Sequence, residues 1–467
     1  MDSLQAAIPP IAFCLFYNKQ VDEDCFRTAL EKSLSSFPCL AGRLVRTGDR
    51  KQSPLQVTYH PDKGGAQLIL QTRSKPYASK DDRRWFPMFT RAPFPAPSEP
   101  VFTYGPLLRI KMTHITSDNS CVISFSFCHA VMDLTSVGAF IQALSTYYTS
   151  TVNATHTGTE GPQEEEYVPA MTTKRVFPPL EDAPQEAPLE RFTTKTLVQA
   201  LPKLVMASVA AKTIHLTLER SELNRLKSDF MEDLGDNASS SSPKMAWIST
   251  YEMLGTLLLG AYYLATKDKL EKNHKKTKPA SNASTSVLEC RCVVDPRKRR
   301  ASPYTNESQQ GNMGEMPSIF LPLESLSKDD IWRNECLQTF HSQLRSSLED
   351  PQKLTTILRK AEASLQQGHL HSPQGRVMSS LLFARNIIET NVTSYNSWLH
   401  LDFFGIGTMG TVVPYHFEVG PGLQCLDMFW VFPQTPETVT VRTTLYPKTA
   451  KRFLKALTDM KIAYQLQ

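Results

Sequence analysis

The chain has 467 residues, a hydrophobic share of 41% and a formal net charge of +5 at pH 7, and this length predicts two domains rather than one. The charge is too small to indicate a nucleic-acid-binding protein, and no stretch approaches the roughly 18 apolar residues that a membrane span needs. The start of the chain lacks the pattern of a secretory signal, so we expect a cytoplasmic protein. The nine cysteines are scattered, which argues against a disulfide framework and against a bound metal.

The first half of the chain alternates predicted strands with predicted helices. Hydrophobic periodicity and turn residues predict, in chain order, a strand at 11–17, a helix at 21–36, a strand at 40–44, a hairpin of strands at 107–115 and 121–128, and a helix at 134–148. Phe37-Pro38 ends the first helix, because proline cannot continue one.

The composition changes after residue 150 to proline, glutamate, threonine and glycine. We therefore predict an N-terminal domain at 1–170, a crossover linker at 171–210 and a C-terminal domain at 211–467. The elements predicted in the C-terminal part are a strand at 212–218, a helix at 221–230, a polar loop at 235–242, a helix at 248–266, a flexible basic segment at 267–286 and a strand at 287–294. Two α/β domains with a cleft between them are the expected architecture.

His129 is the strongest candidate for chemistry. It ends an apolar strand in which Ile123, Phe125 and Phe127 are expected to share its face. Asp133 follows four residues later, so the segment reads HxxxD. An imidazole in a dry, apolar setting is suited to act as a general base. His114 and Asp118 repeat the spacing, but they fall at the predicted hairpin turn, where we expect His114 to be exposed.

Several short segments resemble the motifs of one family and follow the same order. They are Phe37-Pro38-Cys39-Leu40-Ala41-Gly42-Arg43-Leu44, Gly105-Pro106-Leu107-Leu108 with the His129–Asp133 segment, Ile248-Ser249-Thr250-Tyr251-Glu252, Val294-Asp295-Pro296-Arg297-Lys298-Arg299 with Gly311-Asn312, Thr393-Ser394-Tyr395, and Asp402-Phe403-Phe404-Gly405-Ile406-Gly407. On these residues the chain resembles the BAHD family of coenzyme-A-dependent acyltransferases over nearly its whole length. Leu134, Ile406 and Tyr395 depart from the family's usual residues, which indicates a divergent member, one that acts in secondary metabolism.

The resemblance implies a fold and a set of partners. The fold would be α/β, with two chloramphenicol-acetyltransferase-like domains, each a mixed β-sheet flanked by helices, joined by a long crossover. Acyl-CoA would be a co-substrate and no cofactor would be bound permanently. The acceptor would be a small-molecule alcohol or amine, and the protein would be a monomer.

Site roles follow partly from this resemblance and partly from chemistry. The resemblance implies an ion pair between Asp133 and Arg297 that supports the site. It also implies coenzyme A contacts at Ser249 and Thr250, for which a helix N-cap is the other interpretation. A structural turn is expected from Asp402, Gly405 and Gly407.

The chemistry of the reaction suggests further roles. His129 would take a proton from the acceptor. Thr393, Ser394 and Tyr395 could donate hydrogen bonds to an oxyanion or to the substrate, or could simply end a strand. Cys128 is rejected as a nucleophile, because neighbouring strand residues point to opposite faces and its thiol should turn away from His129.

These observations predict an enzyme that moves an acyl group, with acetyl favoured, from coenzyme A to a hydroxyl or amine through a ternary complex. Two alternatives stay open. One is a condensation-type enzyme that acts on carrier-protein thioesters; such enzymes carry HHxxxD, and Cys128 stands here in place of the first histidine. The other is a relative that binds acyl-CoA without catalysis.

Overall fold

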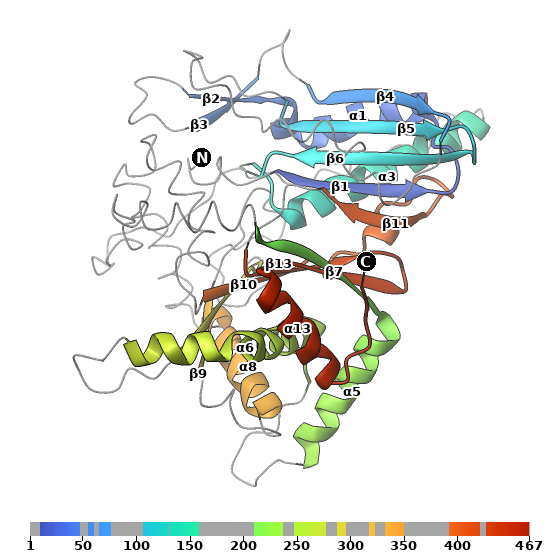
Figure 1. Cartoon of the computed structure of the whole chain (residues 1–467). Helices are drawn as coiled ribbons and strands as arrows, with labels where there is room; N and C mark the ends of the chain where they lie inside the picture. Colours follow the sequence, from blue (N-terminus) through green and yellow to red (C-terminus); the bar gives the residue numbers. More distant parts are fainter. Residues whose placement is uncertain are drawn as a thin grey trace.

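The structure is a computed structural model, and it describes residues 10–46, 55–59, 65–75, 106–129, 131–157, 210–236, 247–276, 287–295, 317–322, 332–349, 392–420 and 426–466. The described strands form a five-stranded sheet, a seven-stranded sheet and a small two-stranded sheet. Helices flank both large sheets (Figure 1). The predicted α/β fold with two mixed sheets is therefore confirmed.

The first sheet has the strand order β11-β1-β6-β5-β4. Its strands are β1 (Ile11–Tyr17), β4 (Gln67–Arg73), β5 (Leu108–Ile115), β6 (Ser120–Phe127) and β11 (Pro414–Val419). Only β4 and β5 run parallel. Two packed helices, α1 (Glu23–Ser36) and α3 (Leu134–Thr157), contribute to the same hydrophobic core as this sheet. The small sheet pairs β2 (Arg43–Arg46) with β3 (Leu55–Thr58).

The second sheet has the strand order β14-β7-β13-β12-β10-β8-β9. Its strands are β7 (Lys212–Glu219), β8 (Val287–Cys292), β9 (Ser318–Pro322), β10 (Val392–Ser397), β12 (Met428–Pro433), β13 (Thr438–Leu445) and β14 (Gln465–Leu466). Strands β8, β10 and β12 are parallel, and the other pairs are antiparallel. The helices on this sheet are α5 (Arg220–Asp236), α6 (Thr250–Lys276), α8 (Trp332–Glu349) and α13 (Pro447–Asp459).

The alternation predicted for β6 is confirmed within the strand. Phe125 and Phe127 face the helices, where the Phe127 ring lies 5.5 Å from that of Phe140 on α3. Ser124 faces the other way, and its Oγ lies 2.9 Å from Cys14 Sγ on β1. The period of two thus separates the aromatic face of β6 from a face on which Ser124 and Ser126 alternate with the buried Val122.

Several elements differ from their predicted bounds; for example, α5 runs to Asp236 and not only to residue 230. The segment Pro38–Ala41 forms a 3-10 helix, and the strand predicted at 40–44 begins only at Arg43. Helix α6 continues to Lys276, although we expected a flexible basic segment from residue 267. Lysine and glutamate favour helices, and Leu270 keeps the buried face going. Helix α3 also runs beyond its predicted end, to Thr157.

The two sheets are interleaved in sequence. Strand β11 pairs with β1 in the first sheet, although the strands before and after it, β10 and β12, belong to the second (Figure 1). The domain boundaries at 1–170 and 211–467 stay a prediction, and they do not include this return of the chain. Most of the predicted linker lies outside the described residues. None of the helices in the described ranges is long and apolar enough to cross a membrane.

Candidate active site

The segment around His129 is a tight turn rather than the end of a strand. Strand β6 ends at Phe127, and the N–H groups of Val131 and Met132 both donate to the Cys128 carbonyl, at 3.0 and 3.2 Å. The Cys128 N–H donates to the Leu107 carbonyl at 2.8 Å, which fastens the turn to the chain just before β5. The expected alternation therefore stops before Cys128. Its side chain belongs to the first hydrophobic core together with Phe127, which corrects its expected place on the opposite face.

His129 lies in a setting that favours the neutral imidazole. Its side chain keeps some access to solvent, but burial lowers its pKa from the ordinary histidine value. The Asp133 carboxylate and hydrogen bonds to backbone groups of His129 and Met132 act in the opposite direction. A neutral imidazole has one ring nitrogen with the lone pair that a base needs.

Asp133 caps helix α3. Its Oδ1 accepts a hydrogen bond from the Ser136 N–H at 2.9 Å, and the residue is only 5% exposed. An aspartate at this position satisfies one of the free N–H groups of the first helical turn. The carboxylate thus connects the His129 turn to the helix. Arg297, its predicted ion-pair partner, lies outside the described residues.

His114, the other histidine in an HxxxD pattern, is a residue of β5. We predicted that it would be exposed, but it is only partly exposed, and its Nδ1 contacts Gln20 Oε1. The Gln20 amide also donates to the Ser120 carbonyl at 2.8 Å. His114 therefore forms part of the packing at the β5–β6 hairpin, and its Asp118 caps the turn by accepting from the Ser120 hydroxyl at 2.6 Å.

The hydroxyl-bearing residues on β10 do not share one environment. Thr393 Oγ1 donates to the Asp427 carbonyl at 2.6 Å, so its proton is engaged there. The Tyr395 ring lies 4.6 Å from that of Tyr251, in the core between the second sheet and its helices. Ser394 alternates to the opposite face. It shares that face with its register partner Met428, which packs into the first core.

The segment that begins β12 places a buried carboxyl beside β10. Asp427 has a φ of 54°, and its N–H donates to the Thr444 carbonyl at 2.9 Å. Burial raises its pKa to about 7, while Lys269 and a hydrogen bond with Tyr262 lower it in part. Ionisation of this group therefore opposes the folded state near neutral pH.

The variant Asp427→Asn is expected to have a higher free energy of unfolding than the wild type. This gain should be roughly 2 kcal/mol larger at pH 8 than at pH 5. A carboxyl whose pKa is raised on folding stabilises the fold below its unfolded-state value, and this contribution is lost as the pH rises through 7. Asparagine has no charge and tolerates a positive φ. Urea unfolding at both pH values measures the difference, and an equal effect at pH 5 and 8 would contradict a raised pKa.

Ser249 forms a capping box at the start of α6. Its Oγ accepts from the Glu252 N–H at 3.2 Å, and Glu252 Oε2 accepts from the Ser249 N–H at 2.9 Å. The Ser249 hydroxyl also donates to Glu252 Oε2 at 2.5 Å. This is the N-cap use that the sequence suggested. The other carboxylate oxygen of Glu252, Oε1, lies 2.9 Å from His341 Nδ1.

The segment that resembles the family's DFGWG motif packs against the first sheet and α3. It forms the short helix α12 (Phe403–Ile406), with Asp402 at the N-cap position. The Tyr17 hydroxyl donates to the Gly407 carbonyl at 2.8 Å. A Cβ at Gly407 would lie 2.6 Å from the Phe403 carbonyl oxygen, so this position accepts only glycine without rearrangement. The segment joins β10 of the second sheet to β11 of the first, and its role as a structural turn stays a prediction.

The N-terminus of α3 also meets the end of a strand in the second sheet. Thr135 Oγ1 donates to Asp295 Oδ2 at 2.6 Å, and Asp295 lies just beyond β8. The His129 turn thus lies near the carboxyl end of a parallel strand, where α/β sheets commonly bind ligands. Sequence reasoning missed this contact, because Thr135 and Asp295 are far apart in the chain and nothing local joins them.

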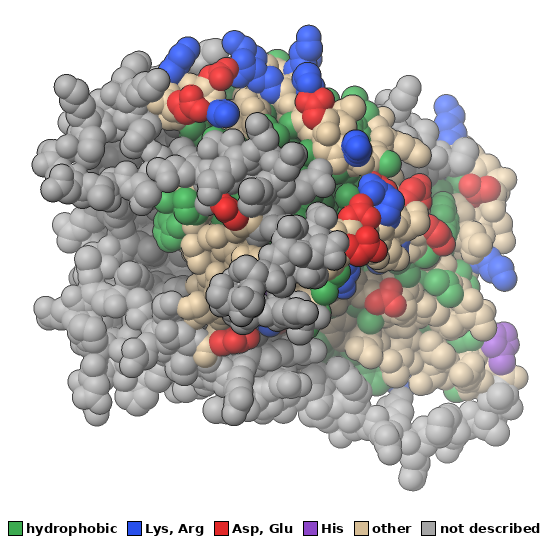
Figure 2. Space-filling model, turned by 90° about the horizontal axis from the view of Figure 1, so that it is seen from below, with side chains coloured by type: hydrophobic (Ala, Val, Ile, Leu, Met, Phe, Trp, Pro, Cys, Tyr) green, Lys and Arg blue, Asp and Glu red, His purple; other side chains and the backbone are tan. Residues whose placement is uncertain are grey.

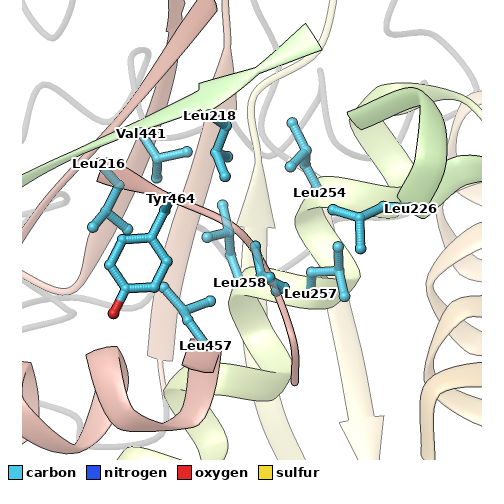
Figure 3. A pocket seen from close by; sticks show the side chains of 10 residues that line it. Leu216, Leu218, Leu226, Leu254, Leu257, Leu258, Val441, Leu457 and Tyr464 are labelled. Carbon is cyan, nitrogen blue, oxygen red and sulfur yellow. The ribbon is translucent and has the colours of Figure 1, made fainter. Parts of the chain in front are cut away.

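An apolar cavity lies away from this turn, between the second sheet and helices α5, α6 and α13 (Figure 3). Leucine, valine and isoleucine side chains line it, with Tyr464 at one side. Apart from Tyr464, whose hydroxyl donates to the Leu454 carbonyl at 3.2 Å, its lining side chains are aliphatic, so we interpret it as a packing gap. Among the described residues, no group of three His, Cys, Asp or Glu could hold a metal ion.

Comparisons with known proteins identify the family of the chain and proteins that share its fold. Residues 94–380 match the model of the Transferase family. Among solved structures, TRI101 of F. sporotrichioides in complex with coenzyme A and T-2 aligns with a TM-score of 0.63 and 16% identity, over 100% of this chain and 98% of that one. TRI101 of F. graminearum with coenzyme A and deoxynivalenol aligns with a TM-score of 0.66 and 15% identity, over the same shares.

Vinorine synthase aligns with a TM-score of 0.57 and 14% identity, over 98% of this chain and 92% of that one. At these identities the structures show a shared fold. No curated protein matches the sequence. The family match covers more than half of the chain. The chain therefore belongs to the Transferase family, the BAHD group of coenzyme-A-dependent acyltransferases.

Proposed function

We propose that this protein transfers an acyl group, with acetyl favoured, from coenzyme A to a hydroxyl or amine of a small secondary metabolite, with His129 as the general base. The observation that carries the proposal is the setting of His129, whose imidazole keeps some solvent access while burial lowers its pKa. A base that is neutral near pH 7 can accept a proton at the moment of attack. Members of this family use acyl-CoA as the co-substrate.

The reaction needs only one proton carrier. With both substrates bound, His129 takes the proton from the acceptor as its oxygen or nitrogen attacks the thioester carbonyl carbon. The tetrahedral intermediate collapses, the C–S bond breaks, and the coenzyme A thiolate leaves. That thiolate takes the proton from the imidazolium, which returns His129 to its neutral form. The carboxylate of Asp133 supports the turn and takes no proton.

Ser394 is the candidate oxyanion donor that its orientation on β10 favours. Thr393 already donates its proton to the Asp427 carbonyl, and Tyr395 lies in the core on the helix side. Ser394 has the opposite orientation, on the face that it shares with Met428. A donor fixed on a strand costs no reorganisation when charge develops on the carbonyl oxygen.

The acceptor class rests on the neighbouring structures and on the surface. Structures of TRI101 hold coenzyme A together with T-2 or deoxynivalenol, both small molecules. Figure 2 shows acidic and basic side chains interspersed on the face that it displays, without a broad field of one sign among the described residues. This one face offers no broad basic surface for a polyanionic macromolecule, and the small ligands of TRI101 favour a small-molecule acceptor.

Ser249 and Thr250 are the candidate coenzyme A contacts, and a matched pair of variants separates them. Because the capping box engages the Ser249 hydroxyl, Ser249→Ala is expected to lower the free energy of unfolding by about 1 kcal/mol and to leave the KM for acyl-CoA within twofold. Thr250→Val keeps the shape of its side chain and is expected to raise that KM with little loss of stability. Denaturant unfolding and initial rates measure both, and the reverse pattern would assign the contact to Ser249.

Free thiol release tests the function directly. Purified protein is mixed with acetyl-CoA and a panel of alcohols and amines, and thiol release is followed against reactions without acceptor. Acceptor-dependent release supports the proposal. Release only with carrier-protein thioesters would instead identify a condensation-type enzyme, and binding of acyl-CoA without turnover on any acceptor would identify a non-catalytic relative.

A further inference from the structure

A short hydrogen bond ties the first turn of α3 to a residue that follows a strand of the second sheet. Thr135 is the second residue of the helix, and its hydroxyl donates to Asp295 Oδ2 at 2.6 Å. Asp295 is partly buried and lies three residues beyond β8. A bond from a hydroxyl to a carboxylate is stronger than one between neutral groups. A carboxylate also interacts favourably with the N-terminus of a helix.

This contact differs from two of the bonds that hold the His129 turn. The Cys128 N–H to Leu107 carbonyl bond fixes the turn to its own sheet, and the Asp133 cap fixes it to its own helix. Neither of these bonds determines where the imidazole lies relative to the second sheet. Thr135 is six residues from His129 and contacts a residue that follows a strand of that sheet.

Other described bonds join α3 to the segment after β10, but they lie further along the helix. Ser145 Oγ donates to the Thr408 carbonyl, and Thr149 Oγ1 accepts from the Gly410 N–H at 3.2 Å. Both lie at least two helical turns beyond Thr135. Their loss would loosen the packing of α3 without moving its first turn directly.

We propose that Asp295, acting through Thr135, is a positioning residue that holds the His129 imidazole at its working distance from groups on the second sheet. The inference rests on the proposed function, in which His129 acts on substrate held between the two sheets. Misplacement of a catalytic group by about 1 Å can cost about a hundredfold in rate. The bond therefore affects the chemical step rather than the binding of acyl-CoA.

Steady-state kinetics of four proteins tests this inference: wild type, Thr135→Val, Asp295→Ala and the double variant. Each single variant is expected to lower kcat by roughly 10- to 100-fold with the KM for acyl-CoA within twofold. The double variant should lose no more than the worse single one, because both remove the same bond. Thr135→Ser keeps the hydroxyl and should restore kcat to within about threefold of wild type.

Thr149→Val is the matched control on the same helix. It removes the bond to the Gly410 N–H, so it should lower the melting temperature while leaving kcat unchanged.

A kcat for Thr135→Val within twofold of wild type overturns the inference, as do losses that multiply in the double variant. Should Thr135→Val not fold, Asp295→Asn supplies the test, because it weakens the acceptor and should lower kcat about three- to tenfold; an unchanged kcat overturns the inference here too. The wild-type measurement tests the proposed function separately. If the wild type shows no acceptor-dependent thiol release, the proposed function is wrong, whatever the variants show.

Discussion

Replacing His129 with alanine is expected to lower kcat by about a thousandfold or more while the protein keeps its fold. General-base catalysis by a placed side chain contributes roughly 10²- to 10⁴-fold, and His129 is the group that the proposed reaction uses to take the proton. The turn itself is held by backbone bonds to the Cys128 carbonyl and the Leu107 carbonyl, none of which needs the imidazole. The melting temperature should therefore stay within a few degrees of the wild-type value.

The pH dependence of the rate gives a second readout of the same group. Because burial lowers the pKa of His129, the imidazole stays neutral at pH values where an exposed histidine is already half charged. We expect kcat/KM to be constant between pH 7 and 8 and to fall only below the ordinary histidine value of about 6.5. Initial rates at constant ionic strength measure the profile.

His114→Ala is the matched control for this variant. His114 lies on β5, in the hairpin that precedes His129, and begins the same HxxxD pattern, but its imidazole contacts Gln20. Its loss should alter stability slightly and leave kcat unchanged. Full activity of His129→Ala would remove the mechanism, and an inactive but folded His114→Ala would show that the two patterns had been assigned the wrong way round.

The sequence predicted best the parts of the chain whose structure depends on local pattern. The strand at 11–17 has the predicted bounds, and the hairpin of β5 and β6 forms as predicted around a turn in which Asn119 has a φ of 57°. Alternation along β6 also separates Phe125 from Ser124 as expected. In each case the signal is a period of two or a turn residue.

The prediction failed where hydrogen bonds that are not visible in a pattern decide the backbone. Cys128 continues the apolar run of β6, yet its carbonyl accepts two N–H groups from the following residues and closes a turn. Alternation therefore could not orient Cys128. Thr393 and Tyr395 show a related limit. Strand geometry states that they share a face, but only the packing of Tyr395 against Tyr251 shows that this face is the helix side.

Long-range pairing is the other feature that the sequence could not supply. Strand β11 returns to the first sheet and pairs with β1, about 400 residues away in the sequence. A division of the chain into two consecutive domains therefore assigns β11 to the C-terminal domain. The bond between Thr135 and Asp295 has the same origin. Both bring residues of the two halves together at or near the candidate site.

Replacing Asp133 with alanine is expected to lower stability and activity together. The variant loses the cap on α3, in which Oδ1 accepts from the Ser136 N–H, and the cost of such a loss is about 1–2 kcal/mol. The His129 turn directly precedes this cap, so kcat should fall at least tenfold as the turn loosens. Urea unfolding and initial rates, measured on the same preparation, test the two effects.

Asp133→Asn separates the cap from the charge. Asparagine is as good an N-cap as aspartate, so this variant should recover most of the stability that alanine loses. If Asp133 acts by holding the turn, activity should return with stability. A folded, stable and inactive Asp133→Ala would contradict the supporting role. A stable but inactive Asp133→Asn would show instead that the reaction requires the negative charge beside His129, because the cap would be intact while the carboxylate that raises the pKa of His129 would be gone.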